Sequence, residues 1–365
     1  MKRRHLVTTL GAGGLATLAG CGGGTQADCK QTASSQKKTI EWIMVTTWPK
    51  GYKVLGEGAE KLAQTIETMS AGRIKIKVFG ANEYVPALQA FDTVASGAAH
   101  MGHGVSYYWK GKLPSAPFFG SIPFGLTAQE MNGWLLKGGG LELWQKMYKK
   151  FGLVPFPAGN TGVQMAGWFN KEINSLADIQ GLKMRIPGLG GEVLKRAGGS
   201  PENIAGAEVF SALKSGRIAA AEWIGPYNDL NFGLHQAAQY YYYPGWHEPG
   251  AAIEVLVNDS ALQALPKDLQ EIVKQACLAA NNDILAEYTA QNWNALETMT
   301  KKHGVKLRRL PDEVLNKFKG IADDIVNEHA SLDPIAQEVV KSFKAFREKA
   351  KQWSSISELA LLQAR

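Results

Sequence analysis

The chain has 365 residues and a formal net charge of +7, with 45% hydrophobic and 20% charged residues. This composition excludes a disordered chain, and the length predicts two globular domains of ordinary size. The positive charges are spread thinly and form no basic patch interleaved with aromatic residues, so we do not expect nucleic-acid binding.

The first 20 residues are typical of a secretory signal. Lys2, Arg3 and Arg4 precede a short, weakly apolar segment that ends in small residues before Cys21. The sequence "LAGC" resembles a bacterial lipobox, which predicts that Cys21 is lipidated after cleavage; a plain signal cleaved elsewhere is the alternative. The adjacent arginines also allow twin-arginine export. Cleavage would remove three positive charges and lower the net charge to +4.

Residues 21–37 are rich in Gly, Ser, Thr and Gln, which predicts a flexible tether. Cys29 lies in this tether and Cys277 in a helical pattern. The three cysteines form neither a CxxC motif nor a Cys/His cluster, so the sequence predicts no zinc site and no evident disulfide. Beyond the signal, no apolar run reaches the roughly 18 residues of a membrane-spanning helix.

The body begins near Lys38 with an alternation of strands and helices. A β-branched and aromatic run predicts a buried strand, and the strict alternation of "RIKIKVFG" predicts a half-exposed one. The elements expected in chain order are strand 39–48, helix 56–69, strand 73–80, a helix opened by Pro86, and a short strand before "SYYW". This order predicts an α/β fold with a largely parallel sheet.

The same alternation restarts in the second half. It predicts a strand, a glycine break and a strand over 154–170, then strand 181–188, helix 207–216, and strands 217–225 and 251–259. From Ser260 the pattern is helical, with Asp268 in a first turn, and residues 311–365 are expected to form further helices.

Two segments share one pattern of helix, Ser-Gly stop, small-residue strand and aromatic exit. Aligning Ser96-Gly97 with Ser215-Gly216 places His103 opposite Glu222. Ligands of open α/β sheets bind outside the carboxyl ends of strands, so the repeated pattern predicts a ligand-binding cleft between two similar halves.

Three polar side chains in apolar surroundings are candidate ligand contacts. Arg185 in "KMRIPG" cannot lose its charge, so it needs an anion: a structural carboxylate or a ligand carboxylate. Gln164 in "GVQMAGW" satisfies nearby backbone, or its carbonyl oxygen binds a cation or the ligand. Asn160 is a turn asparagine, or it donates its amide to the ligand.

Glu222 in "AAEWIGPYND" lies in a small apolar run, where an unpaired carboxylate is costly. Tyrosines in the aromatic runs "SYYW" (106–109) and "QYYYYPGW" (239–246) could line a ligand site and donate hydroxyl hydrogen bonds to the ligand. The alternative is that these rings only pack against apolar neighbours. Glu248 follows the second run. A lone histidine such as His103 is more often a satisfied core residue than a ligand. The sequence contains no GxSxG, Walker, GxGxxG or HExxH motif in a suitable context.

The segments "GNTGVQMAGWF", "IQGLKMRIPG", "AAEWIGPYND" and "YYYYPGW" resemble the extracytoplasmic solute receptors of TRAP transporters. These are bacterial, ion-driven uptake systems of three components. The resemblance covers the chain from about residue 38 onward, and the tyrosine run and the Glu-Trp pair point to the branch that binds 2-oxo acids such as pyruvate, or lactate.

The resemblance implies a periplasmic-binding-protein-like α/β fold of two domains. A cleft divides the domains, and crossing strands and a long helix connect them. We expect domain I to comprise 38–160 with about 250–290, and domain II 161–249 with part of 291–330. Residues 331–365 are then a C-terminal helical extension.

The resemblance also implies roles for particular residues. Arg185 binds the substrate carboxylate, and Tyr107, Tyr108 and Asn160 contact the substrate. A cation, Na⁺ or Ca²⁺, is held beside the substrate by Gln164, Glu222, the Trp223 carbonyl and Glu248, which places Glu222 and Trp223 at both sites. Without the cation Glu222 would repel the substrate carboxylate, so ligand affinity is expected to depend on the cation.

The favoured interpretation is a non-enzymatic receptor that delivers a small monocarboxylate to TRAP membrane subunits. It is exported, and either periplasmic or lipid-anchored facing the periplasm. One alternative is a secreted α/β enzyme for 2-oxo or 2-hydroxy acids that uses Glu222 and His103 as an acid–base pair. Another is an adhesion or sensor protein. The C-terminal helices could pack on their own chain or form a homodimer.

Overall fold

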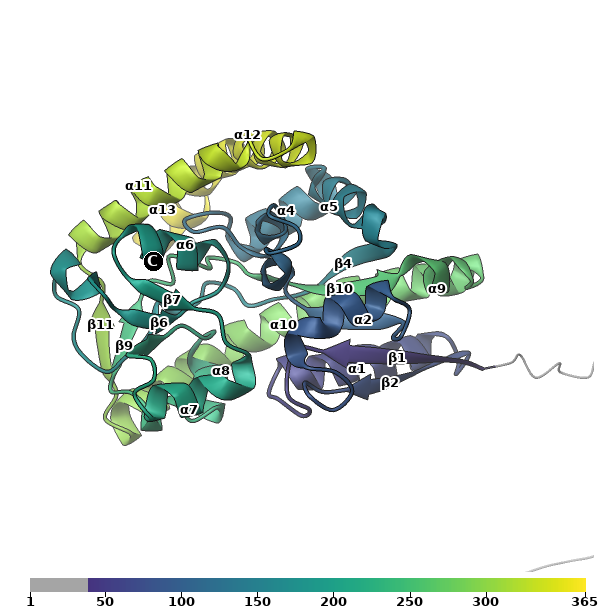
Figure 1. Ribbon diagram of the computed structural model, residues 1–365, viewed down its shortest axis with the longest axis horizontal. Helices are drawn as coiled ribbons and strands as arrows, with labels where there is room; N and C mark the ends of the chain where they lie inside the picture. Colours follow the sequence, from purple (N-terminus) through teal and green to yellow (C-terminus); the bar gives the residue numbers. More distant parts are fainter. Residues whose placement is uncertain (1–38) are drawn as a thin grey trace, which may run out of the picture. The chain divides into compact units, whose positions relative to one another are not determined.

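The computed structural model describes residues 39–365 (Figure 1). The predicted signal, the tether 21–37 and Cys21 lie outside this range. Two mixed β-sheets organise the described residues. Their chain segments alternate with helices, so the predicted α/β class is confirmed. Within this part of the chain, no helix is both long and apolar enough to cross a membrane.

The first sheet has the strand order β2-β1-β3-β10-β4. Its strands are β1 (Ile40–Thr46), β2 (Ile74–Phe79), β3 (Met101–Gly104), β4 (Leu153–Asn160) and β10 (Ala252–Asn258). β1 pairs in parallel with β2 and β3, whereas β10 is antiparallel to β3 and β4. The expectation of a largely parallel sheet therefore holds for β1, β2, β3 and β4, which all run in one direction. β10 runs the other way because the chain re-enters this sheet from the second one.

Six short helices belong to the chain around the first sheet: α1 (Leu55–Met69), α2 (Ala90–Ala95), α3 (Pro117–Gly120), α4 (Ala128–Lys137), α5 (Gly140–Tyr148) and α9 (Asp259–Gln263). Pro86 was expected to open a helix, but it precedes a 3₁₀ turn (Ala87–Gln89) that leads into α2. Another 3₁₀ turn, Ser106–Trp109, carries the "SYYW" run directly after β3.

The second sheet has the strand order β11-β9-β5-β8-β6-β7. Its strands are β5 (Gly167–Phe169), β6 (Lys183–Arg185), β7 (Ser200–Glu202), β8 (Ala220–Ala221), β9 (Tyr240–Tyr243) and β11 (Lys306–Arg309). The helices between them are α6 (Gly188–Arg196), α7 (Val209–Lys214) and α8 (Pro226–Asn231). The predicted strand 217–225 shortens to two residues, so Glu222 and Trp223 lie just past its end.

The long helix α10 (Lys267–Lys302) connects the two sheets, as expected. At about 1.5 Å per residue its 36 residues span roughly 54 Å. Leu269 and Val273 in its first half join the core of the first sheet, whereas Tyr288 and Met299 join the core around the second. Asp268 lies in its first turn and Lys301 in its last, each matching the helix dipole.

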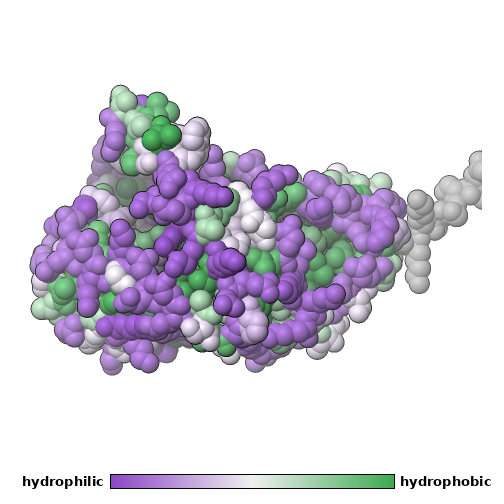
Figure 2. Space-filling model, turned by 90° about the horizontal axis from the view of Figure 1, so that it is seen from above, coloured by the Kyte–Doolittle hydropathy of each residue, from purple (hydrophilic) through white to green (hydrophobic). Residues whose placement is uncertain are grey.

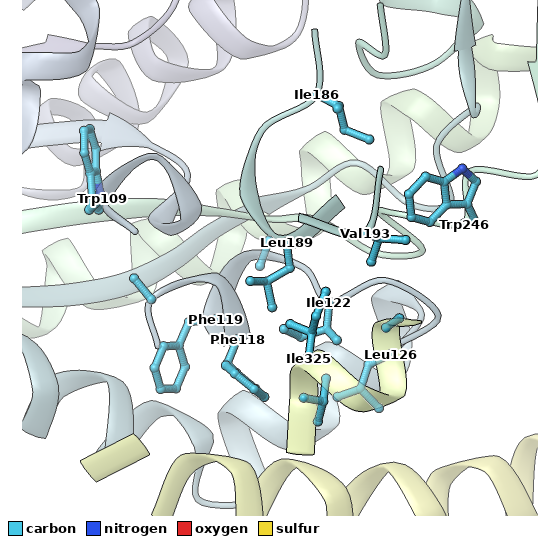
Figure 3. Close-up of a cluster of buried hydrophobic side chains, with 14 of the residues drawn as sticks. Trp109, Phe118, Phe119, Ile122, Leu126, Ile186, Leu189, Val193, Trp246 and Ile325 are labelled. Carbon is cyan, nitrogen blue, oxygen red and sulfur yellow. The ribbon is translucent and has the colours of Figure 1, made fainter. Parts of the chain in front are cut away.

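The C-terminal helices α11 (Asp312–His329), α12 (Pro334–Ile356) and α13 (Glu358–Ala364) confirm the helical reading of 311–365. α11 contacts α6 and α12 contacts α4 and α5, so this arm lies along both halves on the side opposite α10 (Figure 1). Figure 3 shows why it is anchored: Ile325 of α11 lies beside Ile122 and Leu126, with Leu189 and Val193 of α6 next to them. The expected domain boundaries remain a prediction.

Candidate functional site

A small cavity lies between the two sheets. The side of the first sheet provides an apolar and aromatic wall, and the side of the second provides most of the polar groups. The lining residues are Trp48, Leu55, Val105, Tyr107, Tyr108, Thr161, Gln164, Arg185, Trp223, Ile224 and Ile253. Five residues from the predicted site therefore line one cavity: Tyr107, Tyr108, Gln164, Arg185 and Trp223.

Arg185 is the last residue of β6 and is 1% exposed. Its Nη1 pairs with the Glu222 carboxylate, and its Nε donates to the Ile204 carbonyl at 3.3 Å. Its Nη2 has no hydrogen-bond partner, although it is buried. Burial alone would lower the pKa of Arg185, but the Glu222 charge offsets it and the pKa is raised. The guanidinium therefore stays charged, and its Nη2 amino group is without a partner.

Glu222 is held from two sides. β8 places it directly after Ala221, and its backbone N–H donates to the Arg185 carbonyl at 3.0 Å. One carboxylate oxygen pairs with Arg185, and the other lies 3.1 Å from Nε2 of His247. His247 Nδ1 is buried without a partner. Glu222 thus has the compensating partners that a buried carboxylate requires.

Gln164 and Glu248 form the second polar pair. Gln164 donates its amide to Glu248 Oε2 at 2.7 Å, and the hydroxyl of Tyr107 donates to the same oxygen at 3.4 Å. Burial, followed by the Glu222 charge, raises the pKa of Glu248 well above its usual range. The Oε1 atom of Gln164 is buried and accepts no hydrogen bond. This pair presents an unused acceptor beside a second carboxylate.

Close contact between two backbone segments holds Gln164 and Glu248 next to each other. The loop after β9 passes so near Gln164 that a Cβ on Gly245 would lie 2.1 Å from the Gln164 carbonyl oxygen. The N–H of Gln164 also donates to the Glu248 carbonyl at 3.1 Å. Only glycine fits at position 245, because any larger residue would separate the two loops.

The buried acidic groups fit a hard cation. One ligand atom each from Glu222, His247 and Glu248 lie within 4.8 Å of one another, and all three residues are buried. The amide of Gln164 adjoins this group and offers its unused oxygen. Carboxylate and amide oxygens are the donors that Ca²⁺ prefers, and they also suit Na⁺.

Trp223 closes one side of the cavity. The Arg185 guanidinium lies over its ring at 5.1 Å from the centroid, a cation–π arrangement. Tyr108 lies on the opposite wall, 6.2 Å from the ring of Trp48. Burial raises the pKa of both Tyr107 and Tyr108, so their hydroxyls stay protonated and can donate.

Asn160 is placed differently from the other predicted residues. At the end of β4 it is fully buried, its amide donates to the Gly250 carbonyl at 3.2 Å, and its oxygen accepts from the Gly162 N–H at 2.9 Å. It is not among the residues that line the cavity. In this structure Asn160 connects the end of β4 with the loop before β10. Its contact with a ligand stays a prediction.

His103 does not meet Glu222. Its Nδ1 accepts from the Trp48 indole at 2.8 Å, and burial lowers its pKa to about 4. Glu222 instead pairs with Arg185 and His247. Among residues 39–365 no hydrogen bond joins His103 to Glu222, so the geometry does not favour the predicted acid–base pair.

Sequence reasoning missed several residues of the site. His247 adjoins Glu248 in "WHEPG", and that adjacency was the available signal. Thr161, Trp48, Leu55 and Ile253 carry no pattern that separates them from ordinary core residues, because only the tertiary fold brings them to the cavity.

Comparison with known proteins identifies the family of this chain. Residues 44–332 match the model of the bacterial extracellular solute-binding proteins, family 7. A monocarboxylate 2-oxoacid-binding periplasmic protein of Nostoc sp. is 44% identical over 366 residues, covering 99% of this chain and 98% of the relative.

Solved structures are similar as well. A TRAP periplasmic solute-binding protein from Colwellia psychrerythraea, with bound calcium and pyruvate, is 40% identical with a TM-score of 0.87; the match covers 90% of this chain and all of that one. A protein of the same description from Pseudoalteromonas atlantica, with bound sodium and pyruvate, is 41% identical with the same TM-score and coverage. The chain therefore belongs to the bacterial extracellular solute-binding proteins of family 7.

Proposed function

We propose that this protein is the solute receptor of a TRAP-type transporter and captures a small 2-oxo monocarboxylate, such as pyruvate, or lactate, together with Ca²⁺ or Na⁺. One observation carries the proposal. Two polar groups without a hydrogen-bond partner face the same cavity: the donor Nη2 of Arg185 and the acceptor Oε1 of Gln164. The acidic residues Glu222 and Glu248 adjoin them. The two similar proteins that hold calcium or sodium with pyruvate support this assignment.

Arg185 would bind the carboxylate of the ligand. Its unpartnered Nη2 provides the N–H donors, whereas the contact with Glu222 occupies Nη1. Because the guanidinium stays charged, its hydrogen bond to a ligand carboxylate is charge-assisted. Tyr107, Tyr108 and Trp223 lie around the same space and would orient the ligand.

Glu222, Glu248, Gln164 and the Trp223 carbonyl would hold the cation. A bound cation supplies positive charge between these carboxylates and the ligand carboxylate, so three negative groups can lie together. The divalent ion would offset two carboxylates, and the monovalent ion one. His247 would orient Glu222 through its 3.1 Å contact and keep the carboxylate aimed at the cation.

The lining of the cavity supports a small monocarboxylate. Its apolar wall of Leu55, Val105 and Ile253 suits an alkyl group, and among residues 39–365 Arg185 is the one arginine that lines it, which disfavours a dicarboxylate. Two domains, one around each sheet, would close on this ligand. Binding without chemistry agrees with a family of solute-binding proteins, so we propose that the protein is not an enzyme.

The remaining parts of the assignment concern location and partners. We propose export to the periplasm, a lipid anchor at Cys21 and delivery of the ligand to TRAP membrane subunits. Loss of the protein from the membrane fraction on Cys21→Ser would support the anchor, and an unchanged distribution would contradict it. We further propose a homodimer through the C-terminal helices; a similar protein from Bordetella bronchiseptica, 37% identical, is described as a dimer.

Titration calorimetry on the metal-stripped mature protein tests the function. Pyruvate should bind in Ca²⁺ or Na⁺ and bind at least about tenfold more weakly after chelation in sodium-free buffer. Equal affinity in all three buffers would contradict the cation role. Turnover of pyruvate or lactate, followed by NMR, would instead favour the enzyme alternative.

Arg185→Ala should weaken pyruvate binding by about 100-fold or more, because removing a charged partner of a buried pair costs about 2–5 kcal/mol. Arg196→Ala is the matched control, since this exposed arginine of α6 pairs with Glu192 and Glu328 away from the cavity. Circular dichroism would show whether both variants fold. Retained affinity in a folded Arg185→Ala protein would defeat the assignment.

A further inference from the structure

The indole of Trp223 contacts the other side of the cavity. Its N–H donates to the hydroxyl of Tyr52, which lies in the loop between β1 and α1 of the first sheet. The Tyr52 ring stands edge-on to Trp223 at 6.0 Å and to Phe232 at 5.5 Å. Trp223 follows β8 of the second sheet, so this contact joins the two halves outside the polar site.

A second hydrogen bond crosses at the same place. Asn228 of α8 donates its amide to the Lys53 carbonyl at 2.7 Å, and the Asn228 oxygen accepts from Tyr288 of α10. Two neighbouring residues of one loop, Tyr52 and Lys53, therefore bind two elements of the second half. The contact is specific in geometry and is not simple apolar packing.

The backbone of this loop is strained. Val54 has φ 64° and ψ −56°, and the Leu55 N–H donates to the Lys53 carbonyl at 2.8 Å. This is a γ-turn of the rare, strained type, centred on a buried β-branched residue. Such strain persists only where the surroundings determine it. The same Lys53 carbonyl accepts from Asn228, and Leu55 lines the cavity.

The opposite edge of the indole is equally restricted. A Cβ on Gly206 would lie 2.2 Å from the Trp223 ring, so the ring fits only against glycine. The Arg185 guanidinium covers the ring at 5.1 Å. Tyr52, Gly206 and Arg185 thus fix the indole from three sides, and the position of the indole in turn fixes the guanidinium.

We propose that Tyr52 is a positioning residue that couples closure of the cleft to the anion site. It accepts the Trp223 N–H only when the two halves meet, and it then holds the indole against Arg185. The proposal rests on the proposed function for the carboxylate at Arg185. Tyr52 touches no ligand in this scheme; it acts through Trp223 and retards opening.

Stopped-flow binding of pyruvate in saturating Ca²⁺ provides the test. Tyr52→Phe keeps the ring but leaves the Trp223 N–H buried without a partner. Since such a loss costs a factor of about ten in a closed state, the dissociation rate should rise about tenfold with little change in the association rate. Gly206→Ala should change the dissociation rate in the same direction, because it displaces the indole from the other edge.

Tyr84→Phe is the matched control. Its hydroxyl donates to the Ala98 carbonyl within the first half, and its ring is largely exposed, so the rates should stay at the wild-type values. A wild-type dissociation rate in Tyr52→Phe would overturn the proposed role of Tyr52 while leaving the receptor assignment intact. If the wild type itself binds no pyruvate, the proposed function fails.

A second readout follows the same hydrogen bond by NMR in saturating Ca²⁺ and pyruvate. The indole N–H resonance of Trp223, assigned with Trp223→Phe, should be protected from solvent exchange in the liganded wild type and lose that protection in liganded Tyr52→Phe. Equal protection in both liganded proteins would overturn the proposal.

Discussion

At the residue scale, hydrogen-bond satisfaction separates the two amides that the sequence could not distinguish. Gln164 has a buried oxygen without a partner, whereas Asn160 uses both ends of its amide on backbone groups. A buried acceptor that is left unpaired costs free energy, so it indicates a missing partner. Gln164 therefore has the features of a ligand residue, and Asn160 those of a structural residue.

This contrast predicts different defects for the two leucine variants. Gln164→Leu should weaken Ca²⁺ and pyruvate binding about tenfold or more, because the lost oxygen serves the cation; it should also lower stability, because Glu248 loses the amide donor. Asn160→Leu should lower the free energy of unfolding by about 1–3 kcal/mol, since it leaves the Gly162 N–H and the Gly250 carbonyl unpaired. Calorimetry and urea unfolding on both proteins measure the two effects. The reverse pattern would contradict the division of roles.

At the element scale, strand β10 carries a buried carboxylate away from the cavity. Glu254 is fully buried between β3 and β4, and it accepts from the Trp109 indole and, at 3.0 Å, from the Tyr148 hydroxyl. Burial raises its pKa to about 8, and the hydrogen bonds from Trp109 and Tyr148 only partly oppose this shift. The Glu254 carboxyl group of the folded protein therefore stays protonated at neutral pH.

The raised pKa predicts how stability changes with pH. Between pH 4.5 and about 8 the folded protein keeps the Glu254 proton, whereas the unfolded chain releases it. The contribution of Glu254 is therefore complete below pH 4.5 and is lost as the pH rises to 8, by up to about 1.4 kcal/mol per unit. Urea unfolding at several pH values should show Glu254→Gln gaining stability relative to the wild type as the pH rises.

Glu41→Gln is the control for that measurement, because Glu41 is an exposed acid of β1 in the same sheet. A pH-independent difference between Glu254→Gln and the wild type would show that the strand holds Glu254 in its charged form.

At the scale of the whole molecule, the C-terminal arm has one face that residues 39–365 leave exposed. Val339, Val340 and Phe343 of α12 are buried in the core, but apolar side chains beyond them are exposed. Figure 2 shows apolar side chains on a part of the body that projects at the position of α13 in Figure 1. The exposed residues are Trp353, Ile356, Leu359, Leu361 and Leu362. A cluster of this kind is typical of an interaction surface, and we propose that a second copy of this chain binds there.

Sedimentation equilibrium tests the proposed dimer. The mature protein should sediment as a dimer at micromolar concentration, and the double variant Trp353→Ser with Ile356→Ser should raise the dissociation constant at least about tenfold, because it removes two apolar anchors. Trp293→Ser removes an equally exposed tryptophan from α10 and should leave association unchanged. A monomeric wild type would contradict the dimer.

The sequence by itself determined the alternation of strands and helices, the helical pattern after Ser260 and the C-terminal helices, because these follow from local periodicity. That one long helix connects the two halves was implied only by the resemblance. It also identified Arg185, Gln164 and Glu222 as buried polar residues that need partners. These are properties of a short segment, so a short segment reveals them.

Only the tertiary structure decided which partners these residues have. The antiparallel course of β10, the pairing of His247 with Glu222 and the contact of Tyr52 with Trp223 join segments that lie far apart in the chain. Such pairings depend on how the two halves pack, and no local pattern records that packing. The separation of His103 from Glu222 has the same cause: similar sequence patterns placed both at strand ends, but packing assigned each a different partner.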